Sequence, residues 1–158
     1  MKWVNMKIFI LLAALFSFSS NAIASAEKVT VSPSFTLNVG EQDAFEFKSP
    51  QGEFSVVFED DGDTGFFYAL DYSDKLQPIQ EAMHIYNVKA VTDKNNPSVV
   101  RIAWSADGTK AGLWINDYPH AVFDFAAKRG YCRSNFPKPG KWKKQDFSWS
   151  DEVLKYFQ

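Results

Sequence analysis

The segment Val99–Arg133 constrains the fold of this chain more than any other part of the sequence. Apolar and polar residues alternate along it, and two turn sequences, Asp107-Gly108 and Tyr118-Pro119, interrupt the alternation. Asp-Gly between alternating runs is a strong hairpin signal, because a tight turn needs backbone angles that Asp and Gly tolerate. The segment therefore predicts a meander of three antiparallel strands, with Arg129-Gly130 as a further turn into a short fourth strand.

Three more strands are expected upstream, at Ala44–Lys48, Glu53–Glu59 and Gly65–Asp71, because short apolar runs alternate there or lie between turn sequences. The period then changes, and a helix over about Asp74–Asn87 is predicted from apolar residues at helical spacing. These residues are Leu76, Ile79, Met83 and Tyr86.

A second, short helix is expected at the C-terminus, with Ser148 or Ser150 as its cap. Its apolar side is formed by Val153, Leu154, Tyr156 and Phe157. The sequence therefore predicts an α+β fold: an antiparallel β-meander sheet with one central helix and one short C-terminal helix.

The N-terminus has the three parts of a secretory signal peptide. Lys2 and Lys7 are positive, Ile8–Phe16 is apolar, and Ala24-Ser25-Ala26 is a small-residue cleavage site before Glu27. The apolar run is shorter than the roughly 20 residues of a membrane-spanning helix. We therefore expect residues 1–26 to be removed and residues 27–158 to form a single exported domain without a membrane span. The periplasm is the expected location, and secretion to the medium is the alternative.

Charge and cysteine content limit the partners and the covalent structure. The chain has 17 Lys+Arg and 19 Asp+Glu, and without Lys2 and Lys7 the basic count falls to 15, so the mature domain is mildly acidic. Binding to phosphates needs a basic face, so nucleic acid is not an expected partner. Cys132 is the one cysteine, which excludes an intramolecular disulfide and leaves a buried thiol or a dimerising one.

An acidic stretch, Glu59–Asp63, is the most conspicuous candidate for metal binding. A calcium loop needs glycine at its sixth position and glutamate at its twelfth. Counting from Glu59 places Thr64 at the sixth position, and counting from Asp61 places Tyr72 at the twelfth, so both registers fail. The stretch is expected to be a solvated hairpin turn, with Asp60, Asp61 and Asp63 as candidate contacts for a partner.

Histidine and cysteine are too scarce and too scattered for a zinc site, and no phosphate-binding glycine loop is present, so neither metal nor cofactor is predicted. His120, Asp124 and Cys132 can be drawn as a Cys-His-Asp arrangement. No glycine-flanked serine elbow occurs. The sequence therefore assigns no catalytic residue.

The second turn of the meander carries more polar and aromatic side chains than a turn requires. Aromatic residues beside charged ones are typical of binding surfaces. The candidate binding residues there are Trp114, Asn116, Asp117, Tyr118 and His120. Packing in the core is the alternative interpretation of Trp114.

Two segments, Phe58–Asp71 and Asn116–Phe125, together resemble a bacterial family known as domain of unknown function 2251, and His84–Val88 and Arg129–Arg133 fit the same pattern. The resemblance extends over about Phe54–Phe136. It implies no catalytic residue. Small bacterial domains of this type are sometimes immunity proteins of interbacterial toxins, which is an association by class.

The features together favour a non-catalytic periplasmic protein-binding module, such as an immunity or inhibitor protein against a toxin or a cell-wall hydrolase. Two alternatives stay open. One is a small hydrolase-like enzyme that uses His120 with Asp124 or Cys132. The other is a structural, envelope-associated domain.

Overall fold

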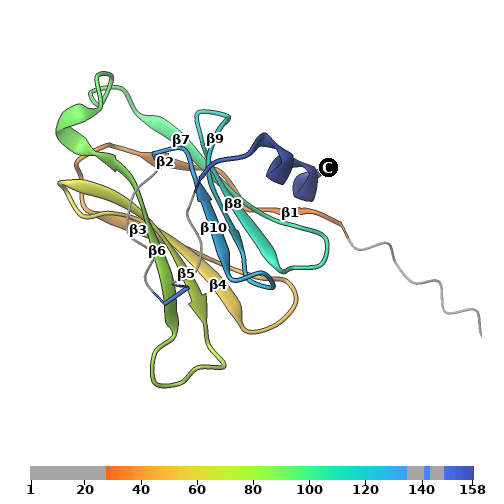
Figure 1. Ribbon diagram of the computed structural model, residues 1–158. Helices are drawn as coiled ribbons and strands as arrows, with labels where there is room; N and C mark the ends of the chain where they lie inside the picture. The colour runs from red at the N-terminus through yellow and green to blue at the C-terminus, as the bar shows by residue number, and fades with distance from the viewer. Residues whose placement is uncertain (1–27, 135–140, 143–147) are drawn as a thin grey trace, which may run out of the picture.

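The computed structural model describes residues 28–134, 141–142 and 148–158. Within these ranges the chain forms two antiparallel β-sheets that pack face to face (Figure 1). The expected signal peptide, residues 1–26, lies outside the described residues. No helix in the described part of the chain is long and apolar enough to cross a membrane.

The described part of the chain begins in the six-stranded sheet, forms the whole four-stranded sheet next, and then returns to complete the six-stranded sheet. The six-stranded sheet contains β1 (Thr30–Val31), β2 (Phe35–Leu37), β7 (Ser98–Trp104), β8 (Lys110–Ile115), β9 (Tyr118–Asp124) and β10 (Arg129–Cys132). Its order is β1-β7-β8-β9-β10, and β2 also pairs with β7. The four-stranded sheet contains β3 (Asp43–Lys48), β4 (Phe54–Asp60), β5 (Thr64–Asp71) and β6 (Ile79–Asn87), in that order.

The predicted α+β class is wrong, because the described residues are mostly β-strand. Two short 3-10 helices are present in them, η1 (Val88–Ala90) and η2 (Asp151–Phe157). The short C-terminal helix is thus found as η2, and the Ser150 side chain caps it by accepting a hydrogen bond from the Glu152 backbone N–H (3.4 Å).

The helix predicted over Asp74–Asn87 is wrong, because most of that segment is β6, which pairs antiparallel with β5. Glu81, Met83 and Ile85 alternate into the buried side of the strand. Glu81 is charged although it points inward, so the apolar residues of this segment do not show the period of two that is typical of a strand.

The predicted meander is confirmed, with two turns in different places. Arg129-Gly130, expected as a turn, is instead the start of β10 and pairs with β9. The turn between β8 and β9 is Asn116-Asp117, two residues before the expected Tyr118-Pro119. Both turn residues have positive φ, 52° and 61°. A two-residue hairpin turn of this kind suits the twist of the strands, and Asn and Asp tolerate it better than other residues with side chains.

Large aromatic side chains fill the space between the sheets. Phe58 and Phe67 from the four-stranded sheet and Trp104 and Phe123 from the six-stranded sheet are fully buried. The rings of Phe67 and Phe123 stack with centroids 5.2 Å apart, which joins the two layers directly. Burying such side chains contributes about 1.5–3 kcal/mol each, so this core stabilises the domain without a disulfide.

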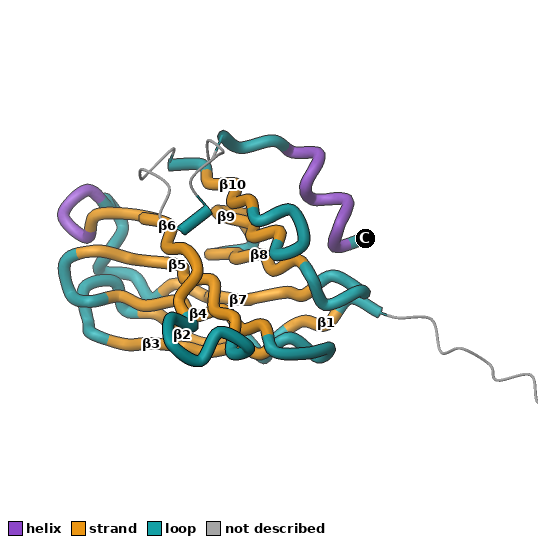
Figure 2. The backbone as a smooth tube through the Cα atoms, turned by 60° about the horizontal axis from the view of Figure 1, so that its bottom comes forward, coloured by secondary structure: helices purple, strands orange, loops and turns teal. Residues whose placement is uncertain are grey.

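The outer faces of the two sheets differ. In Figure 2, η2 runs beside the six-stranded sheet, and its Phe157 ring meets the Trp114 ring of β8 edge-on, with centroids 5.0 Å apart. The other short helix, η1, follows the end of β6. The outer face of the four-stranded sheet therefore has no covering helix among the described residues.

Candidate functional site

Asn116, the first residue of the β8–β9 turn, is held by β7. Its side-chain oxygen accepts a hydrogen bond from the Val99 backbone N–H (2.8 Å), and its side-chain nitrogen donates to the Ser98 hydroxyl (3.2 Å). Its own backbone N–H donates to the Val99 carbonyl (2.8 Å). The polar groups of Asn116 therefore hold the hairpin against β7.

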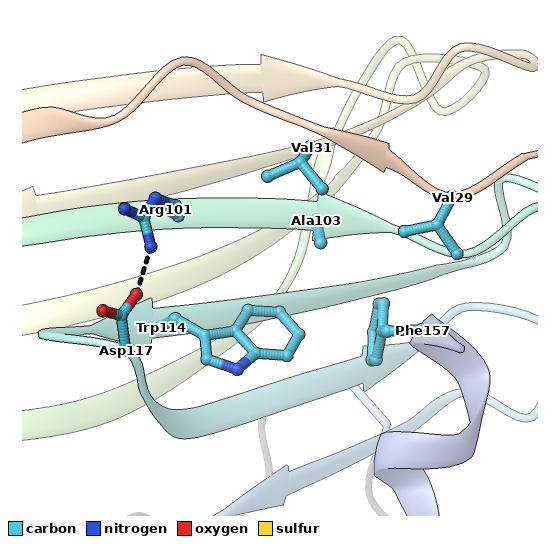
Figure 3. A pocket seen from close by; sticks show the side chains of 7 residues that line it. All are labelled: Val29, Val31, Arg101, Ala103, Trp114, Asp117 and Phe157. Atoms are coloured by element: carbon cyan, nitrogen blue, oxygen red, sulfur yellow. Dashed lines mark hydrogen bonds and ion pairs between the residues drawn. The ribbon is translucent and has the colours of Figure 1, made fainter.

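Asp117, the second turn residue, forms an ion pair with Arg101 of β7 at one end of a shallow pocket. The pocket has a volume of about 300 Å³, and its lining is Val29, Val31, Arg101, Ala103, Trp114, Asp117 and Phe157. Figure 3 shows the ion pair at one end and the Trp114 and Phe157 rings farther along. Val31 is 54% exposed although it is apolar. The pocket is thus an open apolar surface with a charged end.

Tyr118 lies on the other side of this turn and belongs to a stack of aromatic rings around one guanidinium. The Arg133 guanidinium lies 4.6 Å from the centroid of the Tyr118 ring and 4.2 Å from that of Trp149. Asp151 accepts hydrogen bonds from Arg133 (3.0 Å) and from the Trp149 indole N–H (2.6 Å). We call Tyr118, Arg133, Trp149 and Asp151 the arginine stack.

The arginine stack is joined to β9 by hydrogen bonds and is partly open to solvent. Arg133 is anchored to β9, because its Nε donates to the Pro119 carbonyl (2.7 Å) and its backbone N–H donates to the His120 carbonyl (3.1 Å). Tyr118 is nevertheless 51% exposed. Sequence reasoning missed Arg133 and Trp149 as members of this surface, because nothing in the sequence indicates that residues 149–151 lie beside β9.

His120 packs edge-on against the Tyr118 ring, with centroids 5.4 Å apart. Burial, together with the positive charge of Arg133, lowers the pKa of His120 from 6.5 to about 4. The imidazole is therefore neutral at neutral pH and packs with the aromatic groups of the surface.

The acidic loop between β4 and β5 uses two of its carboxylates to build the hairpin. Asp60 is 1% exposed and accepts hydrogen bonds from the Gly40 N–H (2.9 Å), the Gly62 N–H (2.9 Å) and the Tyr86 hydroxyl (2.7 Å). Asp61 accepts from the backbone N–H groups of Asp63 (2.9 Å) and of the residue after it (2.7 Å). Asp60 therefore has a structural role, whereas Asp61 and Asp63 are exposed at the tip.

No group of three His, Cys, Asp or Glu side chains suited to a metal ion occurs in the described ranges. The Cys-His-Asp arrangement is not formed either. Cys132 is buried, its sulfur lies 3.0 Å from the Ser134 hydroxyl, and burial raises the pKa of its thiol. His120 and Asp124 are four residues apart on β9, or about 13 Å along a strand. The Asp124 carboxylate accepts a hydrogen bond from the Ala127 N–H (2.9 Å).

The structure therefore brings part of the predicted site together. Trp114 and Asp117 line one pocket, and Tyr118 and His120 pack against each other beside Arg133. The acidic loop belongs to the other sheet.

Comparison with known proteins supports the resemblance noted in the sequence. Residues 37–158 match the model of a family described as "Uncharacterized protein conserved in bacteria (DUF2251)". An uncharacterized protein of Haemophilus influenzae is 43% identical over 98 residues, which are 60% of this chain and 61% of that protein. The chain thus spans about three fifths of that relative's length. No solved structure matches the chain significantly. Since the family match covers most of the sequence, the chain belongs to this bacterial family of domain of unknown function 2251.

Proposed function

We propose that this protein is a non-catalytic, exported protein-binding module that acts as an inhibitor or immunity protein. Its binding surface is the β8–β9 hairpin with the arginine stack beside it. The observation that carries the proposal is the exposed Tyr118 ring, which packs on the Arg133 guanidinium, while Trp149 from a distant part of the chain packs on the same guanidinium.

Tyrosine, tryptophan and arginine are the residues that contribute most to protein–protein affinity. Binding normally costs about 0.5–1.5 kcal/mol for each flexible side chain that becomes ordered. In this surface the hydrogen bonds from Arg133 to the Pro119 carbonyl and to Asp151 already order the arginine before a partner arrives. The pocket lined by Trp114 and Val31 adds apolar area on the same hairpin.

Capture of a partner from the native bacterium tests the proposal. An affinity tag is inserted in the exposed Asp93–Asn96 loop, because a tag at the C-terminus would disturb η2. Tyr118→Ser removes the exposed ring, and Leu76→Ser is the matched control, since Leu76 is apolar, 94% exposed and outside the surface. We expect a protein that is captured with the wild type and Leu76→Ser and reduced at least about tenfold with Tyr118→Ser.

Identical sets of captured proteins for the wild type and Tyr118→Ser would contradict the proposal and favour the structural, envelope-associated alternative. The thermal unfolding midpoint of both variants provides the folding control. Export is tested separately by the intact mass of the protein in the periplasmic fraction, which we expect to begin at Glu27. A mass that includes residues 1–26 would refute removal of a signal peptide.

A further inference from the structure

A second pocket lies on the outer face of the four-stranded sheet, away from the β8–β9 hairpin. Its volume is about 260 Å³, and its lining is Ala44, Val57, Glu59, Tyr68, Leu70 and Ile79. These residues come from β3, β4, β5 and the start of β6. Ile79 is 55% exposed although it is apolar. No described helix covers this face, so the pocket opens to solvent.

The walls of this pocket combine apolar surface with negative charge. Val57, Leu70 and Ile79 supply aliphatic surface. Glu59 and Tyr68 line the pocket together, and burial together with the negative charge of Glu59 raises the pKa of Tyr68 well above its ordinary value. The Tyr68 hydroxyl therefore stays protonated, and the pocket presents the Tyr68 ring together with the Glu59 carboxylate.

The neighbouring charges on this face are mostly of the same sign. Asp61 adds to the negative potential at Tyr68. Glu46 on β3 lies opposite Val57, and its carboxylate accepts hydrogen bonds from Ser55 (2.8 Å) and Tyr72 (2.7 Å). Lys48 lies farther along β3, with its ammonium 5.5 Å from the Tyr72 ring centroid. The local potential therefore favours a cation.

We infer that this pocket receives the side chain of a lysine or arginine from a partner protein. Both side chains have an apolar stem and a cationic head, so the stem would cover Val57, Leu70 and Ile79 while the head pairs with Glu59. An aromatic ring face also attracts a cation, which is the role of Tyr68. The pocket has the volume of roughly nine water molecules, which is enough for one such side chain.

This pocket and the hairpin surface lie on different sheets, so the inference does not depend on Tyr118. It adds a chemical requirement to the partner: a basic residue on an exposed strand or loop. A pocket that takes one side chain binds a short peptide weakly, so the test must measure affinities in the millimolar range.

Methyl NMR with short peptides tests the inference. Three blocked pentapeptides carry lysine, arginine or norleucine between glycines, and norleucine keeps the apolar stem but lacks the charge. We expect the Leu70 and Ile79 methyl signals to shift saturably with the lysine or arginine peptide. The affinity of that peptide is expected to exceed the affinity of the norleucine peptide by about fivefold, the upper range of an exposed ion pair.

Two matched variants locate the charge effect. Glu59→Gln should reduce the affinity of the cationic peptides to that of the norleucine peptide and leave the latter unchanged. Glu152→Gln removes one exposed carboxylate from η2, beside the other sheet, and should change nothing. Tyr118→Ser should also bind the cationic peptides like the wild type, so this test and the capture experiment fail independently.

Equal affinities for the lysine and norleucine peptides would overturn the inference. So would an affinity that Glu59→Gln leaves unchanged, or the absence of saturable shifts with every peptide. An unchanged thermal unfolding midpoint for Glu59→Gln shows that the variant is folded.

Discussion

Acidification should destabilise this domain through His120. Burial beside Arg133 lowers the pKa of His120 in the folded protein from 6.5 to about 4. In the unfolded chain the imidazole regains its ordinary pKa, so between these two values the unfolded state binds more protons than the folded state. Stability therefore rises with pH through this range and falls as the pH is lowered through it.

The size of this effect follows from the two pKa values. Proton linkage with 6.5 in the unfolded state and about 4 in the folded state gives a loss of about 2 kcal/mol in unfolding free energy between pH 7 and pH 5. The loss reaches about 3 kcal/mol at pH 4. For a domain whose total stability is of the order of 5–15 kcal/mol, this is a large fraction.

Urea denaturation at pH 7, 6, 5 and 4 measures the effect in the wild type and in His120→Gln. Lowered pKa values of carboxylates such as Asp74, at about 2, also destabilise the folded state in acid, but they act equally in both proteins. The difference between the two proteins therefore isolates His120. We expect His120→Gln to lose about 2 kcal/mol less than the wild type between pH 7 and pH 5. Parallel pH profiles would refute the reasoning.

Three further predictions concern buried positions. Asp60→Asn should lower the unfolding free energy, measured by urea denaturation, by about 2–4 kcal/mol, because an amide cannot replace a buried carboxylate that accepts three hydrogen bonds. The control Asp63→Asn, at the exposed tip, should lower it by less than about 0.5 kcal/mol. Equal losses for the two variants would contradict the structural role of Asp60. The Cys132 thiol should react with a chromogenic thiol reagent at least about 100-fold more slowly in native than in denatured protein, because it is buried and its pKa is raised. The absorbance of the released chromophore measures both rates, and equal rates would show an accessible thiol. Gly112→Ala should cost about 1–3 kcal/mol in urea denaturation, because a Cβ there would collide with the Trp114 ring; an unchanged midpoint would show that the ring moves without cost.

The strands were predictable wherever a period of two was undisturbed. Phe45 and Phe47 alternate with charged residues and do form β3. β6 was not predictable in this way, because Glu81 occupies an inward position that a sequence pattern assigns to solvent. Its carboxylate accepts a hydrogen bond from the Trp142 backbone N–H (3.2 Å), a residue 61 positions away. A local sequence pattern cannot show a partner at that distance along the chain. The helical spacing of Leu76 and Ile79 therefore led to the wrong prediction, since both side chains are exposed and do not form a buried face.

The candidate site was predictable in part for a similar reason. The β8–β9 turn is a local feature, so its unusual residues could be found by reading along the chain. The arginine stack depends on Trp149 and Asp151, which approach β9 only after the C-terminal segment has returned to the six-stranded sheet. Composition shows that tryptophan and arginine are present, but their approach is a long-range consequence of the fold.

The polar side chains that drew attention to the β4–β5 and β8–β9 turns mostly form hydrogen bonds that stabilise the fold. The side-chain oxygens of Asn116 and Asp60 accept hydrogen bonds from backbone N–H groups of this chain. Few hydrogen-bonding sites on these side chains therefore remain for a partner protein. Tyr118 is the reverse case, because its ring is ordered by Arg133 and yet more than half exposed. A residue that is ordered but not needed by the core is the kind that binding requires. Tyr118→Ser should therefore leave the unfolding free energy within about 0.5 kcal/mol of the wild type while reducing partner capture at least about tenfold. A loss of stability as large as that of Asp60→Asn would instead make Tyr118 a structural residue.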